Sequence, residues 1–142
     1  MRRQTRRGQR GQAMVECAII LVMTLAVLIG AIDFGQVMYY HQSLAARAQL
    51  GAHWAAVNPY NAASVANMVV YGNPAPTAGN QALISGLTTA MVSSSVSGVN
   101  TNNAMVQVQI QNFPYRFYSP WIAHAYTARP ITVRLTHEPS LP

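Results

Sequence analysis

Lysine is absent from this chain of 142 residues, acidic residues are scarce, and the basic charge is unevenly placed. Five of the nine arginines lie within the first ten residues, whereas residues 12–142 hold four arginines and three acids. A nucleic-acid-binding surface needs a basic face or stripe that is distributed over the domain. Because the charge here is confined to one end of the chain, nucleic acid is not an expected partner.

The three acids also argue against catalysis by paired carboxylates. Glu16 and Asp33 stand at opposite ends of an apolar run, and Glu138 lies near the end of the chain. No serine has the surroundings of a nucleophile elbow, and the Asp-Phe-Gly at 33–35 lacks the other motifs of a kinase. The sequence therefore predicts no enzyme.

Cysteine occurs once, as Cys17, which excludes an internal disulfide. This cysteine begins the apolar run, whereas a lipidated cysteine would end one, so a lipoprotein is not expected. The histidines form no i, i+4 pair and have no cluster of cysteines or acids beside them, so no metal site and no cofactor are predicted. These histidines are His41, His53, His124 and His137.

Charge and proline are both missing from residues 17–32, which read CAIILVMTLAVLIGAI. Counted from Ala13, the apolar stretch has 20 residues and is interrupted only by Glu16, and a helix of about 20 residues spans the ~30 Å hydrocarbon core of a bilayer. Residues 17–32 contain nine Ile, Leu or Val side chains, which favour insertion into the bilayer by about 3 to 5 kcal/mol. We therefore expect a transmembrane helix over residues 12–33.

The arginines predict the orientation of this helix. Five precede the span and the next one is Arg47, so the N-terminus is expected in the cytoplasm and the remainder is expected to be exported. A cleaved secretory signal peptide is the alternative, because the basic start and the apolar run fit one and Ile29 and Ala31 form a poor cleavage site. The acid at Glu16 and the continuation of the helical pattern beyond the run oppose that alternative.

The helical pattern continues after the span. No proline occurs before Pro59, apolar residues keep a helical spacing, and Asn58 precedes the proline as a natural stop. One helix is therefore expected from about residue 13 to residue 57. Within it, alanines at 48, 52 and 56 form a stripe of small residues that permits close helix approach.

Residues 59–142 are rich in Gly, Pro, Asn and Ser and contain strand signals. Apolar and polar residues alternate strictly over 105–111 and 131–136, which predicts two half-buried strands. A third apolar run, Met68–Tyr71, also looks like a short strand. The expected fold class is α+β, with a long N-terminal helix packed on a small antiparallel sheet.

Three other segments of this region have weaker patterns. Residues 82–92 look like a short helix, and residues 93–103 look like a polar loop. Residues 113–126 are rich in aromatic side chains and are interrupted by Pro114 and Pro120. We expect these aromatic residues to cover one side of the sheet.

Several short landmarks occur within and around the apolar run: Gly11-Gln12-Ala13, Val15-Glu16, Ile32-Asp33-Phe34-Gly35, Leu44-Ala45-Ala46 and Gly51-Ala52. With these landmarks, residues 10 to about 57 resemble the TadE-like family of pseudopilins, which are minor pilin-like proteins of the tight-adherence (Flp pilus) machinery. Two differences from the family pattern are Cys17, where Phe is common, and Val22, where Pro is frequent.

The resemblance implies a processing site. A prepilin peptidase would cut between Gly11 and Gln12, and glycine offers that protease an unhindered, extended backbone. Glu16 would then be the fifth mature residue and would pair with the N-terminal amine of a neighbouring subunit, setting its register. The alternative is that Glu16 reaches toward the headgroups near a helix start, where the helix dipole favours an acid. A cut after Gly8 is disfavoured because the fifth residue would be an alanine.

These expectations combine into a domain plan and a function. Residues 1–11 would be a basic leader, 12–33 the transmembrane helix, 34–58 a helical stalk and 59–142 an exported, pilin-like α+β domain. The resemblance implies a non-enzymatic minor pilin in the bacterial inner membrane that supports a pilus for adhesion or secretion. Its partners would be membrane lipid, prepilin peptidase, and other pilins and pilus assembly proteins. The alternative is a single-pass envelope protein whose exported domain binds a ligand outside any filament.

Overall fold

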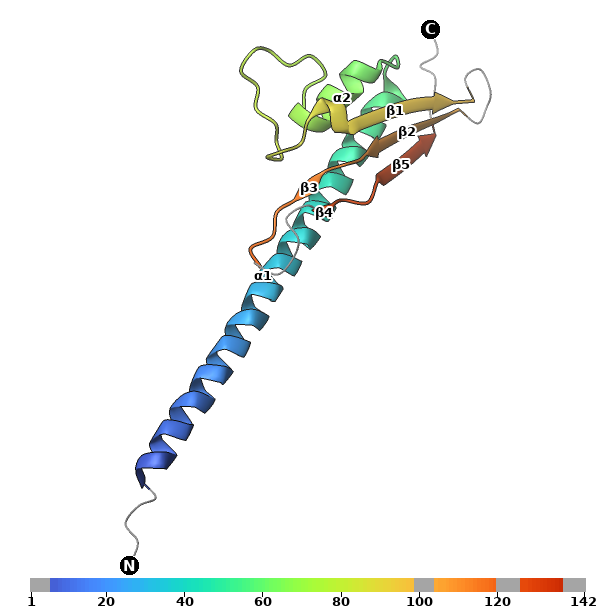
Figure 1. Cartoon of the computed structure of the whole chain (residues 1–142). Helices are drawn as coiled ribbons and strands as arrows, with labels where there is room; N and C mark the ends of the chain where they lie inside the picture. Colours follow the sequence, from blue (N-terminus) through green and yellow to red (C-terminus); the bar gives the residue numbers. More distant parts are fainter. Residues whose placement is uncertain (1–5, 99–103, 120–125, 137–142) are drawn as a thin grey trace, which may run out of the picture. The chain divides into compact units, whose positions relative to one another are not determined.

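The computed structural model describes residues 6–98, 104–119 and 126–136. The chain divides into two compact units, one made of residues 1–36 with 117–123 and the other of residues 37–116 with 124–142. Helix α1 contributes to both units. The secondary structure is a long apolar N-terminal helix followed by a small antiparallel sheet, which confirms the expected α+β class (Figure 1).

Helix α1 extends from Arg6 to Val57 without interruption (Figure 1). Its C-terminal end confirms the sequence prediction: the Asn58 backbone N–H and side-chain amide both donate to the Trp54 carbonyl oxygen, at 3.1 and 2.9 Å. Its start lies earlier than the predicted residue 13. Arginine and glutamine favour helices, and no proline is present to stop the helix.

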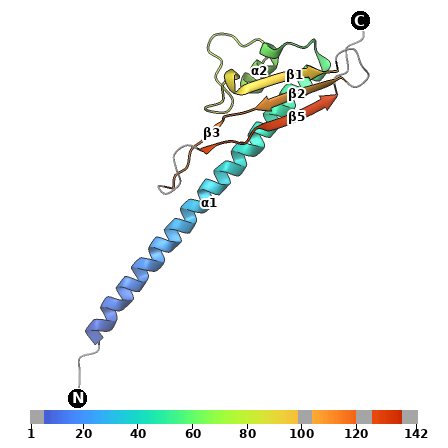
Figure 2. The same cartoon turned by 45° about the vertical axis from the view of Figure 1, so that its right-hand side comes forward.

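The larger sheet belongs to the second unit and contains β1 (Val92–Ser97), β2 (Met105–Ile110) and β5 (Ile131–Thr136) in the order β1-β2-β5. Both pairings are antiparallel, and the three strands lie side by side in both views (Figures 1 and 2). Strands β2 and β5 confirm the two segments of strict alternation. The register places Val108 between Ser94 and Val133.

The core of the second unit lies between this sheet and two helices. Strand β2 buries Val106, Val108 and Ile110 and turns Gln107 and Gln109 to the opposite face, as the alternation predicted. The alanine stripe of α1 is buried as well, together with Leu44. A Cβ atom added at Gly51 would clash with Val69 Cγ2 of α2 (Ala62–Tyr71). Close packing of α1 on α2 therefore requires small residues at this crossing.

The predicted strand at Met68–Tyr71 is wrong, because these residues form the last turn of α2. Asn61 caps the helix start by accepting hydrogen bonds from the Ala63 and Ser64 N–H groups. Gly72 ends the helix in the left-handed conformation, with φ of 71°. The valines that suggested a strand instead belong to a buried helix face, made by Val65, Ala66, Val69 and Val70.

The assignments for residues 82–103 also need correction. No α-helix forms over 82–92: a 3₁₀ turn at Thr89–Met91 leads directly into β1. Most of the expected polar loop is strand, since β1 extends from Val92 to Ser97; residues 99–103 lie outside the described residues. Pairing with β2 holds this serine-rich segment in the sheet despite its weak intrinsic preference for strands.

The aromatic segment forms a small sheet of its own rather than only covering the first. Strand β3 (Pro114–Tyr115) pairs with β4 (Tyr126–Thr127), and Trp121 lies outside the described residues. Phe113 and Tyr115 are buried, with ring centroids 5.5 and 6.4 Å from that of Tyr40 on α1. Burial raises the pKa of the Tyr115 hydroxyl. The aromatic residues therefore join α1 to the strands of the second unit.

Candidate membrane segment and its flanking acids

The residues of the predicted processing site lie in the first turns of α1. Gly11, Gln12 and Glu16 are all exposed, and a Cβ atom added at Gly11 would meet nothing within 4 Å. The backbone is helical here, whereas binding in a protease cleft requires an extended backbone. Residues 1–5 of the predicted leader lie outside the described residues. The site is open to approach, but a protease would have to unwind it.

Beyond Glu16, α1 presents an apolar surface that the chain itself does not cover. Within the part of the chain that the structure describes, α1 is the one helix long and apolar enough to cross a bilayer, and its most apolar stretch is unburied. Exposed fractions reach 65% at Val22 and 72% at Val27. One long apolar helix near the N-terminus fits a single-pass membrane protein.

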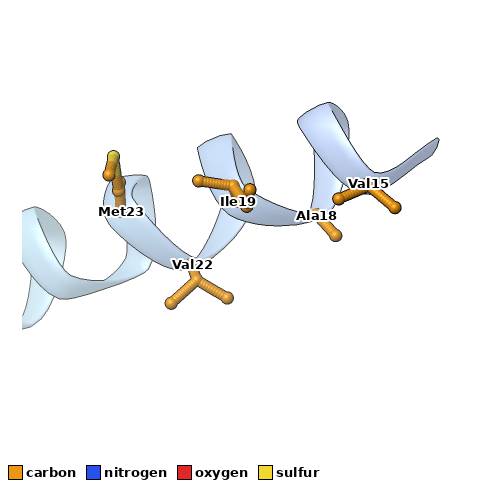
Figure 3. Close-up of a pocket in the computed structure, with 5 residues that line it drawn as sticks. All are labelled: Val15, Ala18, Ile19, Val22 and Met23. Carbon is orange, nitrogen blue, oxygen red and sulfur yellow. The ribbon is translucent and has the colours of Figure 1, made fainter. Parts of the chain in front are cut away.

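One side of this helix carries a shallow apolar hollow. Figure 3 shows its lining on successive turns of α1: Val15, Ala18, Ile19, Val22 and Met23. Their spacing of i, i+3, i+4, i+7 and i+8 places them along one helix face. Because they come from a single helix, they form an open surface that suits lipid chains or another apolar helix. No polar group among them could perform chemistry.

Asp33 ends the apolar run and has partners that the sequence did not reveal. Its side chain is only 3% exposed. One carboxylate oxygen accepts a hydrogen bond from the Tyr118 backbone N–H at 2.7 Å, and the other accepts one from the Ser119 N–H at 3.0 Å. Both contacts lie within the first unit. Hydrogen bonds to an ionised carboxylate are among the stronger ones in proteins. Asp33 therefore fixes a segment that lies 85 residues further along the chain.

The other residues of the family motif behave differently from Asp33. Ile32 and Phe34 are 55% and 68% exposed, and a Cβ atom added at Gly35 would meet nothing within 4 Å. Their side chains therefore contribute little to packing within the chain. Asp33 is the one buried residue of this motif. The motif therefore stabilises the fold through the two hydrogen bonds that the Asp33 carboxylate accepts.

The segment that Asp33 holds has one exposed and one buried side chain. Tyr118 is 71% exposed, whereas Ser119 is only 3% exposed. The Ser119 hydroxyl is buried with it and lies close to the Asp33 carboxylate. The backbone amides of this segment thus point to Asp33 while the Tyr118 ring faces outward. Tyr118 belongs to the aromatic segment noted in the sequence, but neither residue was predicted to contact Asp33, since a backbone donor leaves no residue-type signal.

Metal chemistry was not expected from the sequence, and the described residues contain no group of three or more His, Cys, Asp or Glu side chains that could hold an ion. His124, His137 and Glu138 lie outside the described residues. Cys17 is exposed on α1, within the apolar surface.

The comparison with known protein families gives a match over the same part of the chain. A family model described as TadE-like protein matches residues 11–53, a range that includes Gly11, Glu16 and the motif at 32–35. No curated protein and no solved structure matches the chain. The family match ends within α1 and does not extend to α2 or the sheets. Residues 11–53 are therefore a TadE-like segment, and the family resemblance that their landmarks indicated is confirmed.

Proposed function

We propose that this protein is a membrane-inserted minor pilin or pseudopilin that supports assembly of a Tad/Flp-type pilus. The observation that carries the proposal is the coincidence of the TadE-like match at residues 11–53 with an uncovered apolar helix. TadE-like proteins are associated with the Tad pilus and are not known as enzymes. The protein would therefore act through its contacts in the membrane and with other pilus components, without catalysing a reaction.

In this proposal the helix crosses the bacterial inner membrane once, with the N-terminus in the cytoplasm. Prepilin peptidase cuts between Gly11 and Gln12 and leaves the apolar helix in the bilayer. The exposure of Gly11 supports access. The helical backbone at this point must open first, and each of Gly8 and Gly11 weakens the helix by about 1 kcal/mol relative to alanine. Two glycines within one turn favour that opening.

Glu16 has the assembly role in the proposal. Its carboxylate is exposed on a helix that otherwise presents apolar side chains, where an ionised group is unfavourable in lipid. Pairing with the N-terminal amine of a neighbouring processed subunit would neutralise both charges. Such a pair also sets the axial register, because a one-residue slip would leave both groups unpaired.

The proposal is tested by deleting the gene in native cells and restoring it with wild-type protein, Glu16→Ala or Thr24→Ala. Thr24 is an exposed polar residue of the same helix whose hydroxyl donates to the Ile20 carbonyl oxygen, so its replacement is a matched control. We expect wild type and Thr24→Ala to restore surface pili, and Glu16→Ala to insert normally without restoring them.

Two results would contradict this function. Normal piliation of the deletion strain would remove the protein from pilus assembly and would favour a single-pass envelope protein with an exported binding domain. Normal piliation with Glu16→Ala alone would leave the protein in the machinery but remove Glu16 from its mechanism. Membrane fractionation of each variant confirms that loss of pili is not loss of insertion.

A further inference from the structure

Two exposed aromatic side chains lie beside Asp33 in the first unit: Phe34 follows it in α1, and Tyr118 is bonded to it through its backbone N–H, and together they are termed the aromatic surface. We propose that this surface, with Phe34 and Tyr118 as its anchors, lies in the headgroup region of the bilayer that α1 crosses. The proposal rests on the membrane insertion argued above and adds a second contact with lipid, made by a loop. The argument has three steps: the attachment of the loop, its depth, and the character of its exposed side chains.

The attachment comes from Asp33. Its two carboxylate oxygens accept the Tyr118 and Ser119 N–H groups at 2.7 and 3.0 Å. A buried carboxylate and two backbone donors would each be unfavourable in an apolar medium without partners. Here they satisfy one another, so the loop can approach the bilayer without exposing either amide or the acid to lipid. The contact also fixes residue 118 at the level of residue 33 on the helix.

The depth follows from helix geometry. Asp33 is 17 positions after Glu16 in α1, which corresponds to about 25 Å along the axis. The hydrocarbon core of a bilayer is about 30 Å thick. If Glu16 is near the cytoplasmic boundary, Asp33 is near the outer boundary, where apolar chains meet headgroups. Tyr118, bonded to Asp33 through its backbone, lies at the same level.

The exposed side chains suit this level. Tyr118 is 71% exposed and Phe34 is 68% exposed, and Ile32 continues the apolar surface of the helix toward them. Residues 34–36 and 117–119 carry no charge. Tyrosine is enriched at membrane interfaces because its ring is apolar and its hydroxyl can reach water or headgroups. Ile32 and Phe34 extend the exposed apolar stretch of α1 and flank Asp33, which holds Tyr118, and this favours lipid over a protein partner as the occupant.

Spin labelling of the full chain in phosphatidylethanolamine–phosphatidylglycerol vesicles tests the proposal. Cys17 is the single cysteine, so a Cys17→Ser background allows one label at Tyr118→Cys. Matched labels at Leu25→Cys, exposed in the middle of the span, and at Thr132→Cys, exposed on β5, provide lipid and water references. Accessibility to oxygen and to a water-soluble nickel chelate gives the depth of each label.

We expect the label at 118 to have oxygen and nickel accessibilities between those of the two references. Nickel accessibility equal to that at position 132, with position 25 still in lipid, would overturn the loop contact and leave membrane insertion intact. Water-like values at position 25 would overturn the insertion itself. Low accessibility to both reagents at 118, with spin–spin broadening that dilution by unlabelled protein removes, would show a second copy in place of lipid.

The role of Asp33 is tested in the same labelled protein. Asp33→Ala removes both acceptors, and we expect the label at 118 to become more mobile and to lose its intermediate depth. Gly35→Ala is the matched control, since it keeps the Asp33 acceptors and both backbone donors, and an added Cβ atom there would meet nothing within 4 Å. Unchanged depth and mobility in Asp33→Ala would overturn the attachment.

Discussion

Asp33 and Ser119 are separated by 86 residues, yet the carboxylate of the first accepts the backbone N–H of the second at 3.0 Å. The same carboxylate holds the Tyr118 N–H. A residue at the end of the apolar run in α1 thus determines the position of a short segment from the other half of the sequence. This contact explains why an acid is compatible with burial at the end of the span: each of its oxygens has a donor.

Replacing Asp33 by alanine is predicted to release the segment without unfolding the second unit. Two charge-assisted hydrogen bonds are lost, and we therefore expect local opening at 118 and 119 to become easier. Hydrogen exchange of the full chain in detergent micelles measures this as faster exchange of the Tyr118 and Ser119 amides. Gly35→Ala, in the same turn of α1 but with open surroundings, should leave the Tyr118 exchange rate unchanged; an equal acceleration there would remove the Asp33 carboxylate as the cause.

Gly51→Ala is predicted to destabilise the crossing of α1 and α2. The added Cβ would clash with Val69 Cγ2, on a stiff β-branched side chain within a helix. We expect the free energy of unfolding to fall by about 1–3 kcal/mol, as in other overpacked cores. Thermal unfolding followed by near-ultraviolet circular dichroism reports the change.

Gly35→Ala is the matched control for that substitution. Position 35 is in the same helix, but its surroundings are open, so alanine should be neutral or stabilise the helix by up to about 1 kcal/mol. A similar loss of stability in both variants would mean that glycine itself, and not the approach of Val69, matters at position 51.

Phe113→Ala is predicted to loosen the aromatic cluster that joins α1 to the strands. Phe113 is 2% exposed and contacts the rings of Tyr40 and Tyr115, with centroids at 5.5 and 5.8 Å. Removing a buried phenyl ring costs about 3–5 kcal/mol of unfolding free energy. Tyr39→Ala, at a position that is 67% exposed, should cost less than about 1 kcal/mol. Equal effects in the same thermal assay would contradict the assigned packing.

Processing is predicted to give a mature chain that begins at Gln12. Mass spectrometry of protein from native cells should detect this end, and Gly11→Leu should retain residues 1–11 because the branched side chain hinders the protease cleft. Gly8→Leu is the control and should still be cut after Gly11. A native protein that keeps Met1 while prepilin peptidase is active would contradict the predicted cut.

The sequence predicted the elements whose pattern comes from their own residues. Helix α1 ends where Asn58 and Pro59 stop it, and β2 and β5 alternate because one face of each strand packs on the core. Strand β1 escaped detection because serines weaken its strand signal, although Val92 and Val96 keep the right spacing. Helix α2 was mistaken for a strand because valines favour strands, and the caps at Asn61 and Gly72 were the signals that could have identified the helix.

The contact of Asp33 could not be predicted in the same way. Its donors are backbone amides, and every residue except proline supplies one. Only the folded chain shows that residues 118 and 119 meet the helix. The position of Asp33 at the end of the apolar run was visible in the sequence, but its partners in the folded chain were not.

That dependence on backbone donors has an evolutionary consequence. The two hydrogen bonds place almost no demand on the side chains at 118 and 119, so these positions can diverge freely as far as the attachment is concerned. Proline is the exception, because it has no N–H to give. Asp33 has much less freedom, since its replacement must accept two donors at once. Related chains that share this attachment should therefore vary in the loop while keeping the acid.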